Sequence, residues 1–157
     1  MVFLYQRKTE IKFLLRYKKA YIYITRMDNK DLSHKAKSLE VRQAESRNVN
    51  LKYPDKICAY VEKSMTCKDI DEIDKHKFLV PNTLTIAEFI FIIRKRLHVP
   101  PEKGLFFFVN NHIISGNISM SDISIKHKAP DGFLYITYSA ENCFGTGIEN
   151  PSTLTAL

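Results

Sequence analysis

The sequence has no tryptophan, only five glycines, and no apolar run that approaches the roughly 18 residues needed for a membrane-spanning helix. Its three cysteines, Cys58, Cys67 and Cys143, form no CxxC pair and leave an odd thiol. Neither a disulfide framework nor a zinc knuckle is therefore indicated. A phosphate-binding glycine loop is missing as well, because Gly145-Thr-Gly147 is too short and no helical pattern follows it.

The composition that remains is that of a soluble globular domain. Of the 157 residues, 45% are hydrophobic and 26% are charged, which is enough for one domain with a core and extensions. The net charge of +7 favours acidic partners, which include nucleic acid, an anionic membrane surface and acidic peptides.

Residues 1–33 are predicted to be a basic and apolar N-terminal extension of unknown role. Lysine and arginine interrupt every apolar stretch of this segment, so it does not fit a secretory signal. Two alternatives stay open: a basic segment that lies on a membrane surface, or upstream translation with Met27 as the true start.

The first predicted elements are helices and strands that alternate around prolines. Residues 33–52 are polar and compatible with one or two short helices, which end before Pro54. Residues 57–63 alternate as a strand does, and residues 78–80 form a second short strand. Pro81 closes that strand and places it at a sheet edge or at a strand end.

The clearest helix covers residues 86–97, where Thr85 and Glu88 form a capping box. A strand over residues 105–109, a turn at Asn110-Asn111, a short helix to about His127 and a final strand over residues 133–138 follow. We expect the consecutive Phe106, Phe107 and Phe108 to be buried on both faces of their strand.

The resulting order is two helices followed by β-β-α-β-α-β. This order predicts an α+β fold, a ubiquitin-like β-grasp with a four-stranded mixed sheet and two additional N-terminal helices.

No residue pattern indicates catalysis or a cofactor. Cys58 could be paired with a histidine as nucleophile and base, but no spacing supports this pairing. The histidines also lack the short spacing of a metal site. We therefore predict no catalytic residue, no metal and no cofactor. We also predict no nucleic-acid partner. RNA binding through Arg94-Lys95-Arg96 ranks third among the hypotheses, because a matching RNA-recognition motif is missing.

The strand over residues 78–80 suggests a binding function. A free edge strand can pair with an extended peptide, and nearby basic side chains would attract acidic residues of that peptide. These basic residues are Lys56, Lys75, Lys77 and Arg96. The alternative is an ordinary edge strand that its lysines protect from aggregation.

Five spaced motifs resemble those of the GABARAP-like family of autophagy-related ubiquitin-like modifiers. They are Lys52-Tyr-Pro-Asp-Lys56, Asp74-Lys-His-Lys-Phe-Leu-Val-Pro81, Ile93-Arg-Lys-Arg96, Phe106-Phe-Phe-Val-Asn-Asn111, and Gly132-Phe-Leu-Tyr-Ile-Thr-Tyr-Ser139 with Phe144-Gly145. The similarity covers residues 34–145, which we take as the modifier domain, and leaves residues 1–33 without a counterpart.

The resemblance implies a modifier that is not itself an enzyme. A cysteine protease would recognise Phe144 and cut after Gly145, which would remove residues 146–157 as a propeptide. Enzymes of the E1, E2 and E3-like types would then join Gly145 to phosphatidylethanolamine. The protein would be cytoplasmic and, after lipidation, bound to the autophagosome membrane, where it would act in autophagosome formation.

The resemblance also implies a groove for acidic receptor peptides of the form aromatic-x-x-aliphatic. The aromatic pocket would use Glu45, Val49, Cys58, Tyr60, Lys77, Leu79 and Phe133. The aliphatic pocket would use Phe78, Val80, Pro81, Leu84, Phe89 and Ile92, and the acidic flank would meet Lys75 and Arg96. This chain departs from the family at Cys58 and Tyr60, and a tyrosine there would fill the aromatic pocket. The alternative function is a basic peptide-binding module that is not conjugated and keeps its tail.

Overall fold

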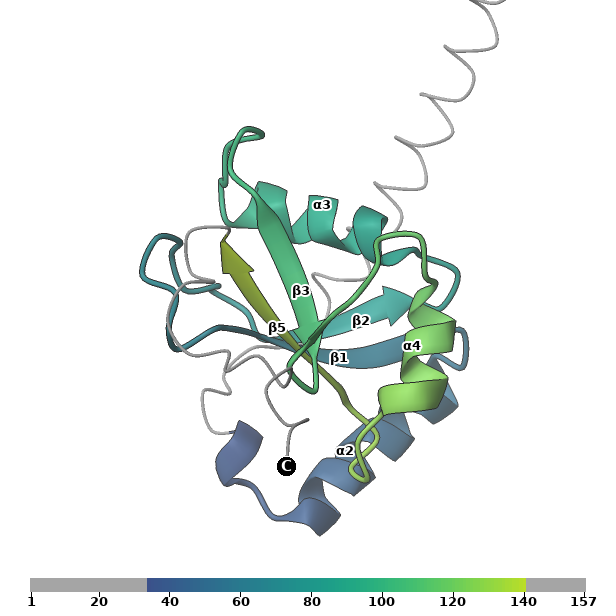
Figure 1. Cartoon of the computed structure of the whole chain (residues 1–157). Helices are drawn as coiled ribbons and strands as arrows, with labels where there is room; N and C mark the ends of the chain where they lie inside the picture. The colour runs from purple at the N-terminus through teal and green to yellow at the C-terminus, as the bar shows by residue number, and fades with distance from the viewer. Residues whose placement is uncertain (1–33, 141–157) are drawn as a thin grey trace, which may run out of the picture.

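The computed structural model describes residues 34–140, which form one sheet and the helices that pack on it (Figure 1). The strands are β1 (Lys56–Lys63), β2 (Lys77–Pro81), β3 (Leu105–Val109), β4 (His112–Ile113) and β5 (Leu134–Ala140). The helices are the 3-10 helix η1 (His34–Ala36) and the α-helices α2 (Leu39–Lys52), α3 (Ile86–Arg96) and α4 (Met120–His127). Residues 1–33 and 141–157 lie outside this description.

The sheet is mixed and has the order β2-β1-β5-β3-β4. The central strands β1 and β5 are parallel, and β2 and β3 pair antiparallel on their outer sides. The predicted α+β β-grasp is confirmed, although the sheet has a fifth strand, the two-residue β4. This strand forms because Asn110 and Asn111 both adopt positive φ values, 50° and 65°, which turn the chain back beside β3.

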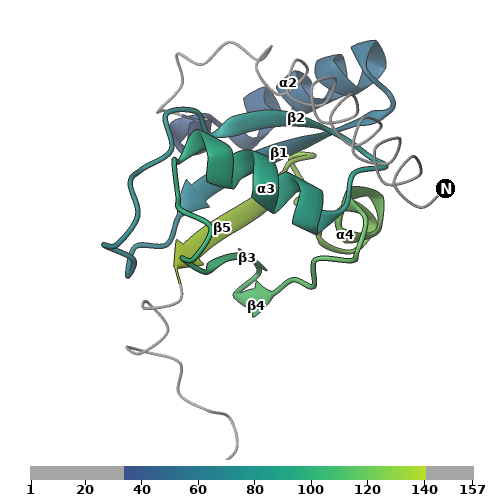
Figure 2. The ribbon, with the colours of Figure 1, turned by 90° about the horizontal axis from the view of Figure 1, so that it is seen from above.

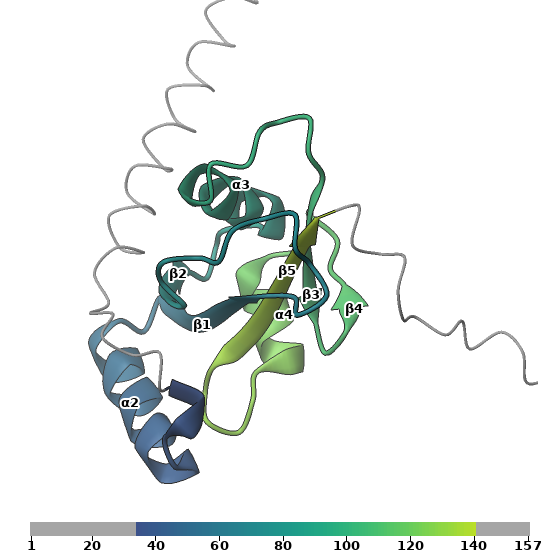
Figure 3. The same ribbon diagram turned by 90° about the vertical axis from the view of Figure 1, so that its left-hand side faces the viewer.

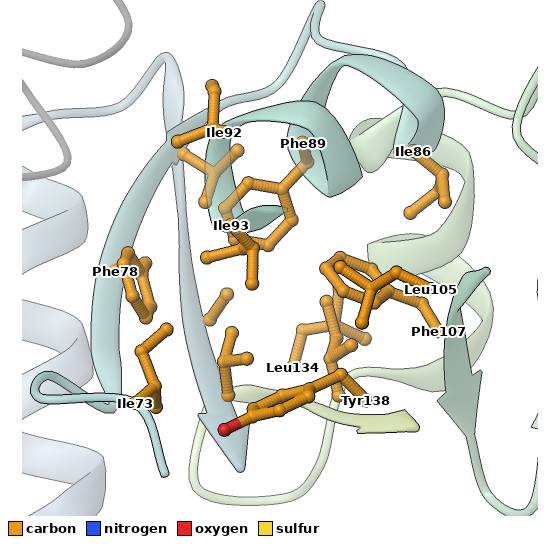
Figure 4. Close-up of a cluster of buried hydrophobic side chains, with 14 of the residues drawn as sticks. Ile73, Phe78, Ile86, Phe89, Ile92, Ile93, Leu105, Phe107, Leu134 and Tyr138 are labelled. Atoms are coloured by element: carbon orange, nitrogen blue, oxygen red, sulfur yellow. The ribbon is translucent and has the colours of Figure 1, made fainter. Parts of the chain in front are cut away.

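The helix α3 lies across one face of the sheet and covers the main core (Figure 2). Its N-terminus is fixed as the sequence predicts, since Thr85 accepts a hydrogen bond from Glu88 N while the Glu88 carboxylate accepts one from Thr85 N. Phe89 and Ile93 of α3 point down toward Phe107 and Leu134 of the sheet (Figure 4). Each of these four side chains is at most 1% exposed.

The helix α2 lies on the opposite side of the sheet from α3, with η1 beside it (Figure 3). Ser38 caps its N-terminus. Ser46 is the fully buried residue of α2, and polar contacts rather than an apolar stripe hold much of this helix. A second, smaller cluster of buried side chains lies between α2 and the sheet.

Two expectations are corrected by the structure. The three phenylalanines of β3 are not buried on both faces: Phe107 is 1% exposed, and Phe106 and Phe108 are half-buried, because β3 alternates between the α3 face and the other face. The second correction concerns the cysteines, for which the sequence indicates no disulfide framework. Cys67 is nevertheless disulfide-bonded, whereas Cys58 is a buried free thiol.

Within residues 34–140, no helix combines the length and the apolar composition that a membrane crossing requires.

Candidate functional site

The predicted groove depends on β2, which stands at the edge of the sheet. Within residues 34–140 its only strand neighbour is β1. Backbone hydrogen bonds flank this pair at both ends, from Val61 N to the His76 carbonyl (2.7 Å) and from Asn82 N to the Asp55 carbonyl (3.0 Å). These two bonds fix which positions of the antiparallel ladder are hydrogen-bonded.

Hydrogen-bonded positions alternate with positions whose backbone groups point away from the partner strand. Counting from the flanking bonds, the backbone groups of Phe78 and Val80 face β1. The N–H and carbonyl groups of Leu79 point to the edge of the sheet, as do those of Lys77. An extended peptide that added itself here would pair with Leu79.

The seven residues predicted for the aromatic pocket lie together between α2 and the sheet. Cys58, Tyr60, Leu79 and Phe133 form one buried cluster, and Val49 of α2 packs against it. At the rim, Lys77 Nζ donates to Glu45 Oε1 over 2.6 Å, and the lysine is only 2% exposed. The structure therefore brings these residues together, but as a filled cluster rather than an open pocket.

Two aromatic rings fill this cluster, and one of them was not predicted. His34 of η1 is fully buried, with its ring stacked on Tyr60 at a centroid distance of 4.9 Å and set edge-on to Phe133 at 4.5 Å. Tyr60 also stacks on His76, with the ring centroids 5.5 Å apart, and is 5% exposed. Tyr60 belongs to the buried cluster. Its filling of an aromatic pocket and its effect on peptide choice both stay predictions.

A buried carboxylate supports the His34 ring. His34 Nε2 lies 3.2 Å from the hydroxyl of Tyr135, which donates a 2.5 Å hydrogen bond to Asp131 Oδ2. The same oxygen accepts a hydrogen bond from Arg42 Nε of α2 over 2.9 Å. Burial, and then the bond to Asp131, raises the pKa of Tyr135, so the hydroxyl stays protonated and continues to donate.

The residues predicted for the aliphatic pocket lie where the other face of β2 packs against α3. Phe78, Val80, Leu84, Phe89 and Ile92 are each at most 2% exposed. They belong to the main core, where the rings of Phe78 and Phe89 meet edge-to-face at 5.8 Å (Figure 4). These five side chains are core residues, and their use as an aliphatic pocket stays a prediction.

Pro81 and the two basic residues predicted for the acidic flank lie nearer the surface. Pro81 and Lys75 are half-buried. Arg96 donates to both carboxylate oxygens of Asp74, over 2.7 and 3.1 Å, and its guanidinium lies 5.7 Å from the centre of the Phe78 ring. This fork, chiefly through its hydrogen bonds, lowers the pKa of Asp74. Arg96 thus already holds one carboxylate of its own chain.

Cys58 does not have the properties of a nucleophile. Burial raises the pKa of its thiol to about 11, so the thiolate is scarce at neutral pH. Within the described part of the chain, no group of three histidine, cysteine or carboxylate side chains is arranged to hold a metal ion.

The predicted conjugation site lies beyond the described residues. Strand β5 ends at Ala140, and Phe144 and Gly145 follow it outside residues 34–140. The same is true of the extension 1–33 and of the segment 146–157, so both boundaries stay predictions.

Comparisons with known proteins agree on one family. The family model described as "Autophagy protein Atg8 ubiquitin like" matches residues 41–145. Autophagy-related protein 8 of Schizosaccharomyces pombe is 48% identical over 112 residues, which cover 69% of this chain and 89% of that protein. Autophagy-related protein 8d of Arabidopsis thaliana is 46% identical over 107 residues, with coverages of 68% and 88%.

A solved structure gives the same answer for the fold. The crystal structure of Trypanosoma brucei ATG8 superposes with a TM-score of 0.65 at 38% sequence identity, over 73% of this chain and 97% of that one. Members of this family are ubiquitin-like modifiers and in general not enzymes. The sequence match, the β-grasp sheet and the structural likeness together show that this chain belongs to the Atg8 family of autophagy-related ubiquitin-like proteins.

Proposed function

We propose that this chain is processed to end at Gly145 and is then conjugated through that carboxylate to phosphatidylethanolamine. The observation that carries the proposal is the family match, which continues past the last strand and ends at residue 145. Strand β5 pairs with β1 and β3 on its two sides, so it is a firm anchor for the segment that follows it. Glycine suits the reaction because it has no Cβ to hinder attack on an activated carbonyl.

The partners follow from this chemistry. A cysteine protease removes residues 146–157, and E1-, E2- and E3-like enzymes activate the new carboxylate and transfer it to the amine of the lipid. The protein is then cytoplasmic before lipidation and bound to the autophagosome membrane after it. There it recruits receptors whose acidic aromatic-x-x-aliphatic peptides add a strand to β2.

Mass measurement of the protein isolated from its own cells tests the conjugation. We expect a pool that ends at Gly145 and a second pool that is heavier by one phosphatidylethanolamine. Gly145→Ala should abolish both species. Gly147→Ala is the matched control, because it makes the same change two residues further along and should leave both species in place.

Three other outcomes would count against the proposal. An intact Leu157 terminus in every pool would favour a basic peptide-binding module that is not conjugated. Loss of processing in Gly147→Ala instead of Gly145→Ala would move the conjugation site to Gly147. Processing to Gly145 with no lipid-sized addition would restrict the proposal to cleavage.

A further inference from the structure

The starting point is the position of His34 within the groove. Its ring contacts two of the residues predicted to line the aromatic pocket, Tyr60 at 4.9 Å and Phe133 at 4.5 Å. Its Nδ1 lies 3.8 Å from Oε2 of a third, Glu45. Glu45 in turn holds Lys77, the fourth residue of the pocket that surrounds this ring. A peptide aromatic ring cannot enter between these side chains while His34 is there.

The ring is held only in part by polar contacts. Nε2 has the Tyr135 hydroxyl at 3.2 Å, but Nδ1 is buried and has no hydrogen-bond partner. Oε2 of Glu45, which faces Nδ1, has no hydrogen bond either, although Lys37 Nζ lies 3.7 Å from it. Buried polar atoms without partners cost free energy that they recover in water. The unsatisfied Nδ1 therefore lowers the stability of the closed state relative to an open state in which water reaches this atom.

The element that carries His34 is short. The 3-10 helix η1 has three residues, and so small a helix has little stability of its own. A hollow of about 430 Å³ borders it, lined by Lys35 together with residues of α2 and of the loop before β5. Polar contacts of this segment include Lys35 to Glu62 at 2.6 Å, between partly exposed groups, and Lys37 to Glu45 at 3.7 Å. Arg42 also donates to the carbonyl groups of Lys35 and Lys37. η1 contributes no strand to the sheet.

We propose that His34 is an intramolecular plug of the aromatic subsite, and that a receptor peptide binds with its aromatic residue only after η1 has moved out. The proposal rests on the proposed peptide-binding function of the groove and adds its regulation. The measured affinity of such a peptide is the affinity of the open state reduced by the fraction of molecules that are open.

The charges around the ring give the plug a pH dependence. The charged or titratable groups that face it are Glu45 and Arg42 of α2, Lys77 of β2, Tyr60 of β1, Tyr135 of β5 and Asp131 of the preceding loop, with Lys35 and Lys37 on its own segment. Burial, followed by Lys77, lowers the pKa of His34 more than Glu45 and Asp131 raise it.

The sign follows directly from this lowered pKa. In the closed state the neutral ring is favoured, and in the open state the ring titrates near its ordinary value of about 6.5. Protonation therefore favours the open state, so peptide affinity should increase as the pH falls from 7.5 to 5.5. The increase is at most about tenfold. Protonation of a single group can shift the equilibrium between the closed and open states by no more than about a factor of ten at pH 5.5, which is one pH unit below the open-state pKa near 6.5.

The experiment compares the natural full chain with three variants by calorimetric titration. The titrant is one synthetic peptide, which has three aspartates, then tryptophan at the first and leucine at the fourth position of the motif. His34→Ala should bind at least about fivefold more tightly than the natural chain at pH 7.5 and show no increase toward pH 5.5. His34→Phe keeps a neutral ring in place, so it should bind no more tightly than the natural chain and should also lack the pH response. His112→Ala removes an exposed histidine of β4 and should behave like the natural chain.

A second peptide, with alanine in place of tryptophan, shows whether the effect belongs to the aromatic subsite. The gain from His34→Ala should disappear with this peptide, because nothing then enters the vacated space. In the natural chain, binding of the tryptophan peptide should shift the ring resonances of His34 toward those of a histidine in water.

Several results would overturn the inference. Equal affinities of the natural chain, His34→Ala and His34→Phe would show that His34 does not obstruct the peptide, while the peptide-binding function itself would stand. A His34→Ala gain that persists with the alanine peptide would also overturn it. No binding by any form would overturn both the groove's proposed function and the inference. A thermal melt of each variant confirms that the titrated protein is folded.

Discussion

At the residue scale, Gly132 determines how the chain enters β5. Its φ is +86°, and a Cβ at this position would lie 2.3 Å from Ser46 Oγ and 2.9 Å from Ser46 Cβ. The serine cannot easily move away, because it is buried and its hydroxyl donates to the Asp131 carbonyl over 2.5 Å. A glycine is therefore required both by the backbone conformation and by the contact with α2.

We expect Gly132→Ala to destabilise the fold by about 2–4 kcal/mol, because backbone strain and the clash with Ser46 add together. Urea unfolding followed by circular dichroism measures this change. Gly116→Ala is the control: its Cβ would lie 3.1 Å from Ala87 Cβ, a tight but adjustable contact. We expect this variant to lose no more than about 1 kcal/mol. Equal losses in the two variants would show that the turn before β5 is not under this constraint.

The same turn shows what sequence can and cannot predict about a residue. Asp131 and Gly132 form a turn, closed by the hydrogen bond from Gly132 N to the Ala129 carbonyl, as these two residue types favour. The second role of Asp131, as the buried carboxylate that holds Arg42 and Tyr135, depends on a partner 89 residues away. His34 was missed for the same reason, since its hydrogen-bond partner is 101 residues further along the chain. No local pattern contains such contacts.

At the scale of elements, signals that are local in the chain predicted the structure well. The start of α3 was correctly predicted because the capping box is formed by two residues three positions apart. The prediction that β3 is buried on both faces was wrong. A run of identical aromatic residues shows no alternation, and only the neighbouring elements decide which face of the strand is covered. β4 was not predicted, since two residues are too few to show any period.

The edge strand β2 makes a prediction about individual amide groups. The N–H groups of Phe78 and Val80 face β1, and the Leu79 N–H points to the edge. In hydrogen exchange followed by NMR, Phe78 and Val80 should be protected with or without peptide. The Leu79 amide should exchange rapidly in the free protein and at least about tenfold more slowly when the peptide is bound, because the added strand accepts its hydrogen bond.

The exchange pattern separates strand addition from other modes of binding. A peptide that binds without slowing the Leu79 amide would contact side chains near β2 without extending the sheet. Slow exchange of this amide in the free protein would indicate that the edge is already covered. The Ile136 amide of the central strand β5 is a suitable internal reference, because β5 has strand neighbours on both sides.

At the scale of the whole molecule, the two faces of the sheet share a dependence on groups that must stay neutral. Cys58 lies in the cluster under α2, and Tyr135 packs against this cluster. Tyr138 lies in the main core. Burial raises the pKa of all three groups, for Cys58 from 9.0 to about 11. A raised pKa in the folded state gives stability that is complete below the unfolded pKa and is lost as the pH increases through the folded pKa.

We therefore expect the free energy of unfolding to fall steeply between pH 9 and pH 11. Cys58 is 1% exposed, and its shift of about two units corresponds to about 2–3 kcal/mol of this fall. Urea midpoints measured from pH 7 to pH 11 test the prediction. Cys58→Ala should be less stable at pH 7, because it loses buried volume, but its curve should be shallower from pH 9 upward. Tyr138→Phe loses the hydrogen bond to the Asp71 carbonyl and should be shallower only above pH 10. If both variants keep the slope of the natural chain, the loss of stability at high pH arises from the many surface lysines and not from the buried groups on the two faces of the sheet.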